Sequence, residues 1–125
     1  MTNPTRPDRK KAWRWGQLAE TLAVVGLRGS GHFIVAKRYR TNVGEIDLVA
    51  KRGNTIIFIE VKARRRLSDG LASIGHRQQQ RIVRAAQWFL QKHPRFSNHK
   101  IRFDAIAIAP WRWPRHVKDA WRPNI

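Results

Sequence analysis

The sequence predicts an α/β domain in which a mixed central β-sheet is flanked by helices. Three observations predict it: a helical pattern precedes a run of strand-like segments, an apolar hairpin lies within that run, and a second helix leads into a further strand. The predicted element order is αβββαβ. An antiparallel meander followed by a helical crossover to another strand gives both parallel and antiparallel pairs in one sheet.

The N-terminal part of the chain divides into an arm and a helix. Residues 1–9 are basic and contain two prolines, and we predict a disordered basic arm there, followed by a single domain over residues 10–125. A helical pattern covers residues 10–28 and ends at glycines. The apolar residues predicted to form its core stripe are Trp15, Leu18, Leu22 and Val25.

The remaining elements follow from alternation, turn residues and helical spacing. Residues 63–75 are rich in Arg, Ser and Gly and are predicted to be a loop, and Pro94 ends the second helix. The predicted strands cover residues 32–40, 44–51, 55–63 and 101–109, and the predicted second helix covers residues 76–93.

The middle of the chain carries a strong hairpin signal. Gly53 and Asn54 separate two apolar runs, and glycine supplies the positive φ that a two-residue hairpin turn requires. With this turn, Arg52 pairs with Thr55 and fixes the register of both strands. A four-residue loop would keep the same residues on one face, whereas a three-residue loop would separate them.

This register brings charged residues together inside apolar strands. Asp47 falls opposite Glu60, and Glu45 falls opposite Lys62. Two facing carboxylates repel each other unless a cation lies between them, and Mg²⁺ or Mn²⁺ bound by carboxylates is the cofactor we expect. The alternative is a cross-strand ion-pair network, with Glu45 on Lys62 and Asp47 on a nearby arginine.

The composition points to a polyanionic partner. Lys and Arg total 26 against 8 Asp and Glu, which gives a net charge of +18. Nucleic acid, or an anionic membrane surface, fits this charge, and nucleic-acid binding would be strongly salt-dependent. The chain has no cysteine and its longest apolar run is too short to span a bilayer, so we expect a cytoplasmic protein without a membrane association.

Several basic and aromatic residues have two interpretations. The arginines that follow the hairpin and those on the second helix could hold a phosphate backbone or simply be solvated. Asp104 is interpreted as the partner of a nearby arginine such as Arg102. Three tryptophans in the tail are interpreted either as a hydrophobic lid or as a surface for stacking on unpaired bases. The candidate backbone-binding residues are Arg64, Arg65, Arg77, Arg81 and Arg84, and the tail tryptophans are Trp111, Trp113 and Trp121.

Four segments together resemble a known family. They are Gly16-Gln17-Leu18-Ala19-Glu20, Tyr39-Arg40-Thr41 with Gly44-Glu45-Ile46-Asp47-Leu48-Val49-Ala50, Phe58-Ile59-Glu60-Val61-Lys62-Ala63-Arg64, and Arg102-Phe103-Asp104. Over about residues 10–121 the chain resembles the YraN-like family of predicted nucleases. That family is placed in the PD-(D/E)xK restriction-endonuclease-like superfamily and is related to archaeal Holliday junction resolvases.

The resemblance implies a restriction-endonuclease-like core and assigns roles to particular residues. It implies that Asp47 and Glu60 bind the metal with the carbonyl of Val61, and that Lys62 is the catalytic lysine. It also implies that Glu20 reaches toward the metal and that the second helix supplies a polar residue, for which Gln79 is the candidate. The chain departs from the family pattern at Ala19, where glycine is common, and at Gln78, where lysine is common.

Two functions remain open from the sequence. The first is a metal-dependent nuclease that hydrolyses phosphodiester bonds of structured or branched nucleic acid, with DNA favoured over RNA. A two-fold junction as substrate would favour a homodimer. The second is a non-catalytic, basic nucleic-acid-binding protein that uses the same fold. A protein that only binds has no physical need to oppose Asp47 and Glu60 in its sheet.

Overall fold

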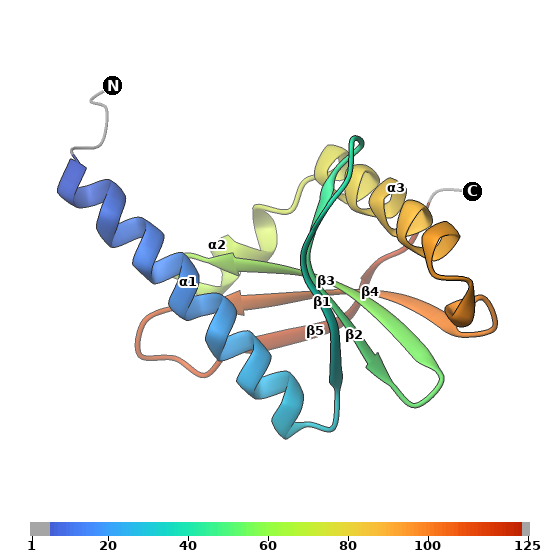
Figure 1. Cartoon of the computed structure of the whole chain (residues 1–125). Helices are drawn as coiled ribbons and strands as arrows, with labels where there is room; N and C mark the ends of the chain where they lie inside the picture. The colour runs from blue at the N-terminus through green and yellow to red at the C-terminus, as the bar shows by residue number, and fades with distance from the viewer. Residues whose placement is uncertain (1–5, 124–125) are drawn as a thin grey trace.

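The computed structural model describes residues 6–123, with side chains described from residue 15 onwards (Figure 1). It contains three α-helices, a short 3₁₀-helix and five strands. In chain order the elements are α1 (Arg6–Gly29), β1 (Phe33–Arg40), β2 (Glu45–Arg52), β3 (Thr55–Ala63), α2 (Leu67–Ala72), α3 (His76–Lys92), η1 (Pro94–Phe96), β4 (Lys100–Ile108) and β5 (Arg115–Trp121).

The five strands form one mixed sheet in the order β1-β2-β3-β4-β5. β3 and β4 are parallel, and the other neighbouring pairs are antiparallel. The crossover through α2 and α3 makes the β3–β4 pair parallel, because parallel neighbours need a long connection. The predicted fold class is therefore confirmed, and the arrangement is consistent with a restriction-endonuclease-like core.

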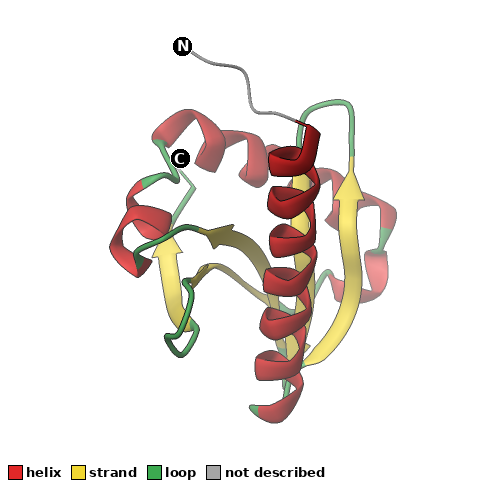
Figure 2. Cartoon of the chain, turned by 90° about the vertical axis from the view of Figure 1, so that its left-hand side faces the viewer, coloured by secondary structure: helices red, strands yellow, loops and turns green. Residues whose placement is uncertain are grey.

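Helices cover both faces of the sheet and create two apolar layers. On one face, Phe58 of β3 packs against Phe89 and Ile82 of α3, and Leu71 of α2 borders the same cluster. On the other face, Ile57 and Ile59 pack with the side chains of α1, which lies lengthwise across the strands (Figure 2). β3 is buried from both sides, as a central strand with continuous apolar sequence should be.

The first helix differs from its prediction in length and in the face that it buries. It begins at Arg6 and so includes residues 6–9 of the predicted arm, while residues 1–5 lie outside the described part. Pro7 is compatible with this start, because its missing N–H would be unpaired in the first turn anyway. The residues buried against the sheet are Ala19, Ala23, Val24 and Leu27.

The predicted core stripe of α1 is largely on the outside. Leu18, Leu22 and Val25 are exposed, and Trp15 is only partly buried. The small side chains of Ala19 and Ala23 allow the helix to approach the sheet closely, whereas hydrophobicity alone favours the larger residues. This rotation is important for the site, because it turns Glu20 toward the sheet.

Two segments for which no helix or strand is predicted form regular structure. Residues 67–72 of the predicted loop form α2, where a Cβ added at Gly70 would lie only 3.3 Å from Ala107 Cβ and from the carbonyl oxygen of Lys62. So short a helix depends on this tertiary packing and gives a weak sequence signal. The tail forms β5, an edge strand whose charged residues show no clear alternation of apolar and polar residues.

Asp104 explains how β5 is held. Its buried carboxylate accepts two hydrogen bonds from Arg102 at 2.8 and 2.9 Å, which confirms the predicted partner. It also pairs with His116 Nε2 at 2.7 Å and accepts from the main-chain N–H of Asp119 at 2.9 Å, both on β5. Burial alone would raise the pKa of Asp104, but these hydrogen bonds hold it below its ordinary value.

No helix within residues 6–123 combines the length and the apolar character needed to cross a membrane.

Candidate active site

The hairpin has the predicted register for most of its length. Arg52 pairs with Thr55, and Gly53 adopts φ +57° in the two-residue turn. The ladder continues to the pair Leu48–Ile59 and ends there, one step before Asp47 and Glu60. The two carboxylates therefore lie where β2 and β3 separate. The prediction that Asp47 and Glu60 form a directly opposed pair within the ladder is wrong.

The side chain of Asp47 occupies the opening between the strands. Its Oδ2 accepts a hydrogen bond of 2.8 Å from the main-chain N–H of Val61, a group that would otherwise bond to a main-chain carbonyl. Ile46 packs in the core beside α3 and Leu48 in the core beside α1, although alternate residues of a regular strand share a face. Regular strand geometry is therefore interrupted at Asp47.

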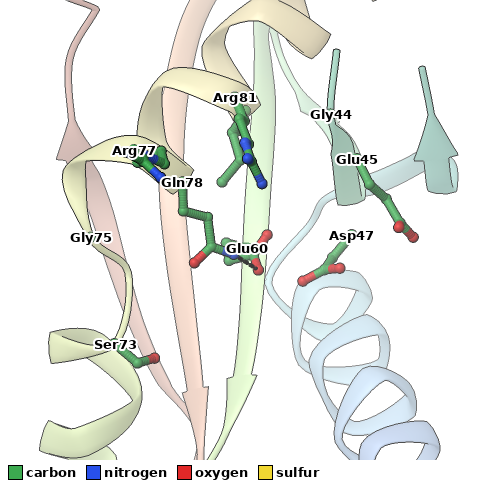
Figure 3. A pocket seen from close by; sticks show the side chains of 10 residues that line it. Gly44, Glu45, Asp47, Glu60, Ser73, Gly75, Arg77, Gln78 and Arg81 are labelled. Atoms are coloured by element: carbon green, nitrogen blue, oxygen red, sulfur yellow. Dashed lines mark hydrogen bonds between the residues drawn. The ribbon is translucent and has the colours of Figure 1, made fainter. Parts of the chain in front are cut away.

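Glu60 is held by two neighbours on one of its oxygens. The side chain is 7% exposed, and its Oε1 accepts a 2.8 Å hydrogen bond from Gln78 Nε2 of α3. Lys62 Nζ lies 3.1 Å from the same oxygen. Figure 3 shows Asp47 directed toward Glu60 from the other side, while Glu45 points away.

Burial dominates the electrostatics of the two carboxyl groups. Burial and the neighbouring charge of Asp47 raise the pKa of Glu60 to about 7, while Lys62 acts in the opposite direction. Burial also raises the pKa of Asp47, although the Val61 N–H partly offsets it. Asp47 has no ion-pair partner between residues 15 and 123, so the alternative network with Glu45 on Lys62 is not formed; Glu45 pairs with Arg40 at 3.4 Å instead.

Three hollows meet at Asp47, and the smallest, of about 310 Å³, is lined by Glu20, Arg38 and Glu45. The largest, of about 520 Å³, lies between the sheet and the N-terminal half of α3, with Glu60, Gln78 and Arg81 in its lining. The second, of about 350 Å³, lies beside α1 and contains Glu20, Lys62 and Arg64. A substrate in any of these hollows would therefore contact the Asp47 carboxylate.

Glu20 is near the site but is paired with another residue. It shares the second hollow with Asp47 and Lys62, as the sequence led us to expect. Its Oε2 accepts a 3.0 Å hydrogen bond from Arg38 Nε. Arg38 has a backbone φ of +50°, which is unusual for a residue with a long side chain, and this conformation accompanies its contact with Glu20.

The residue that α3 supplies is Gln78 and not the predicted Gln79. Gln79 Nε2 donates to the main-chain carbonyl of Ile74, in the connection before the helix, at 3.1 Å. Consecutive helical residues point about 100° apart, so only one of them can face Glu60. Two identical residues in a row give no sequence signal to choose between them.

The predicted backbone-binding arginines fall into two groups. Arg77 and Arg81 line the larger hollow, and Arg64 lines the second. Arg65 and Arg84 are exposed and contribute to neither hollow. Arginines therefore border the carboxylates on two sides, Arg77 and Arg81 in the larger hollow and Arg64 in the second.

Gly44 brings the chain entering β2 close to α3, and replacing it should disturb this packing. A Cβ at this position would lie 2.7 Å from the main-chain oxygen of Arg81. We expect Gly44→Ala to lower the free energy of unfolding by about 1–3 kcal/mol, because backbone has to move. Urea denaturation measures this change. Gly26→Ala is the matched control, since a Cβ there contacts nothing within 4 Å and helical alanine should stabilise slightly. Equal stability of Gly44→Ala and wild type would contradict the close approach.

Comparison with known proteins identifies the family. Residues 19–108 match the model described as "Uncharacterised protein family UPF0102". The chain belongs to the UPF0102 family. It is 45% identical over 121 residues to a UPF0102 protein of Mesorhizobium japonicum, with 97% of each chain covered. It is 50% identical over 115 residues to one of Bradyrhizobium diazoefficiens, covering 92% of this chain and 86% of the relative.

The UPF0102 assignment confirms the resemblance to the YraN-like family. The matched region contains Glu20, Asp47, Glu60, Lys62 and Gln78, so the whole candidate site lies within it. The UPF0102 name specifies no activity, and the function therefore has to be argued from the chemistry of the site.

Proposed function

We propose that the protein is a metal-dependent nuclease of the PD-(D/E)xK type that hydrolyses phosphodiester bonds in structured or branched nucleic acid. The observation that carries the proposal is the meeting of Asp47 and Glu60, with Lys62 beside them, where β2 and β3 separate. Burying two carboxylates next to one lysine is costly for a purely structural purpose. The same cost is reasonable in a site that binds a cation.

The donor atoms fit a hard divalent cation. Asp47 and Glu60 contact each other. The hydrogen bonds from Val61 and Gln78 and the ion pair with Lys62 go to Asp47 Oδ2 and Glu60 Oε1, so none of these three groups occupies Asp47 Oδ1 or Glu60 Oε2. Side chains 15–123 contain no closed cage of three or more His, Cys, Asp or Glu. Mg²⁺ commonly takes one or two carboxylates and completes its shell with water and substrate phosphate.

The proposed roles of the residues follow from their positions. Asp47 and Glu60, with the carbonyl of Val61, would hold Mg²⁺ or Mn²⁺; when bound, the ion supplies a lowered water pKa and neutralises charge at the phosphoryl group. Lys62 would orient the attacking water and stabilise the negative charge that develops on the phosphoryl oxygens. Gln78 fixes the orientation of the Glu60 carboxylate through Oε1.

Arginines on α3 complete the proposed site. Arg77 and Arg81 line the hollow that contains Glu60 and would bind the phosphates on either side of the scissile bond. In the reaction, a water oxygen bonds to phosphorus, the P–O ester bond breaks, and the leaving oxygen takes up a proton. DNA is the favoured substrate; the homodimer and the cytoplasmic location remain expectations.

The test is a cleavage assay with and without Mg²⁺ or Mn²⁺ on duplex, single-stranded, flap and four-way-junction DNA and on RNA. We expect cleavage of at least one branched substrate, dependent on the metal and absent in Asp47→Ala. Metal binding by Asp47→Ala, followed by calorimetry, should also be lost. Salt-sensitive binding of all substrates, with no cleavage of any and unchanged affinity in Asp47→Ala, would favour the non-catalytic nucleic-acid-binding protein.

A further inference from the structure

The connection between β4 and β5 exposes two tryptophans to solvent. Trp111 is 100% exposed and Trp113 is 91% exposed. A hydrophobic lid would bury these rings, so that interpretation is wrong for both, although it describes Trp121, which is buried against Phe103. Large aromatic rings left in water beside arginines are typical of a binding surface.

The backbone at Trp111 adopts a costly conformation. Arg112 N donates to the carbonyl of Ala109, which closes a turn with Pro110 and Trp111 as its central residues. Trp111 has φ +61°, a conformation that this turn position normally assigns to glycine or asparagine. Pro114 restricts the other side of the segment. A tryptophan held at positive φ in an exposed turn is consistent with a functional reason for the ring.

The turn begins where β4 ends, and β3 ends on the same side of the sheet (Figure 1). β3 and β4 are parallel and Ala63 pairs with Ile108, so both strands end together. Arg64 N donates to the carbonyl of Ile108 at 3.0 Å, and Arg64 lines the hollow that contains Lys62. Trp111 follows Ile108 by three residues, a reach of about 10 Å along the chain.

A second connection runs along α1. The hollow beside Lys62 includes Gly16, Ala19 and Glu20 of this helix. The next hollow along α1, of about 330 Å³, is lined by Leu22, Gly26 and Trp113. Ala19 in the first hollow and Ala23 in the next lie about one helical turn apart on the same face of α1, so the two hollows border neighbouring parts of this face.

We infer that Trp111 and Trp113 form a stacking surface for unpaired bases, so that the nucleic-acid substrate has a single-stranded segment beside the bond that is cut. The inference rests on the proposed nuclease function and specifies its substrate. Charge complementarity favours nucleic acid, because the exposed Arg112 and Arg115 lie close to the two tryptophans in the sequence and Lys118 lines the same hollow as Trp113. Aromatic rings stack on any base and so select an unpaired strand without selecting a sequence.

The experiment measures binding without metal, by fluorescence anisotropy, in a Glu60→Gln background. The ligands are a blunt duplex, the same duplex with a single-stranded tail, and the tailed duplex with abasic positions in the tail. We expect Trp113→Ala and Trp111→Ala each to weaken binding of the tailed duplex by about tenfold, with little change for the blunt and abasic ligands. The salt dependence should be unchanged, because the substitution removes no charge.

Two further variants test the interpretation. Phe33→Ala removes another exposed aromatic ring, at the opposite end of the sheet, and should bind all three ligands like wild type. Trp111→Gly should lower affinity for the tailed duplex and raise the melting temperature, because glycine relieves the positive φ. A merely structural role for Trp111 would instead move affinity and stability in the same direction.

Three results would overturn the inference. The first is equal loss of affinity for tailed, blunt and abasic ligands. The second is wild-type affinity for all ligands together with a change from dimer to monomer in light scattering, which would make the surface a self-association site. The third is wild-type affinity together with lost binding to anionic vesicles. If binding of the tailed duplex depends on its bases but the wild-type protein cleaves no substrate, the nuclease proposal is overturned and the stacking surface is retained.

Discussion

Replacing Lys62 by methionine is expected to lower the rate of metal-dependent cleavage by about 10²–10³-fold with little effect on substrate affinity. Lys62 Nζ lies 3.1 Å from Glu60 Oε1 and is mostly buried, so its charge acts in a partly desolvated site. Removing a cation whose interaction strengthens as charge develops on the phosphoryl group lowers kcat, whereas removing a uniform binding interaction raises KM. Single-turnover rates with saturating protein measure the chemical step.

Glu60→Gln should lose activity at least as completely, because it removes a proposed metal ligand and keeps the size of the side chain. The matched control is Glu45→Gln, on the strand beside it. Glu45 is exposed, pairs with Arg40 and points away from Asp47 (Figure 3). Equal loss of cleavage in Glu45→Gln would mean that acidic residues support the local fold and not the chemistry. Full activity of Lys62→Met would remove Lys62 from the mechanism.

Sequence reasoning succeeded where local chemistry determines the structure. The Gly53-Asn54 turn has one favourable geometry, and it fixes the pairing of β2 with β3 as far as Leu48 and Ile59. The meeting of Asp47 and Glu60 follows from that register alone. What the register could not show is the separation of the strands at Asp47, because the bond from Val61 N–H to a side chain competes with the main-chain ladder.

Helix orientation was predictable only where one face of the helix is apolar. α1 is apolar on two sides, and hydrophobicity favours Leu18 and Leu22 over Ala19 and Ala23, which are the ones buried. Close approach of helix and sheet decided the outcome, and it depends on the whole fold. Arg38 illustrates the same limit, since its positive φ and its pairing with Glu20 exist only after α1 and β1 come together.

The sequence could not predict which of Gln78 and Gln79 contacts Glu60, for a different reason. Both residues have the same chemistry, and a change of one position in the helix start exchanges their directions. The site as a set of residue types is therefore encoded locally, whereas the identity of the α3 contributor depends on how the connection after α2 ends at Gly75. Gln79 contributes by holding that connection through the Ile74 carbonyl.

The contribution of Glu60 to stability without metal is expected to fall as the pH rises from about 5 to 8, whereas His32, whose pKa burial lowers, acts in the opposite direction. The pKa of Glu60 is raised from 4.5 to about 7 in the folded protein by burial and by Asp47. A carboxyl group with a raised folded pKa binds its proton more tightly in the folded state, so its stabilising contribution is complete below pH 4.5 and is lost as the pH passes 7. The expected loss is on the order of 3 kcal/mol.

A divalent cation should reverse this loss, because it binds the ionised carboxylates of the folded state only. Urea denaturation in EDTA and in Mg²⁺, at pH 5 and pH 8, measures both effects. Glu60→Gln should remove the fall in stability that Glu60 causes, together with the stabilisation by Mg²⁺. The pKa of Asp104 is lowered, so its stabilising contribution is lost only when the pH falls below the ordinary pKa of an aspartate. Asp104 therefore does not change stability between pH 5 and pH 8. Mg²⁺ that stabilised Glu60→Gln as strongly as wild type would place the cation elsewhere, even if cleavage were observed.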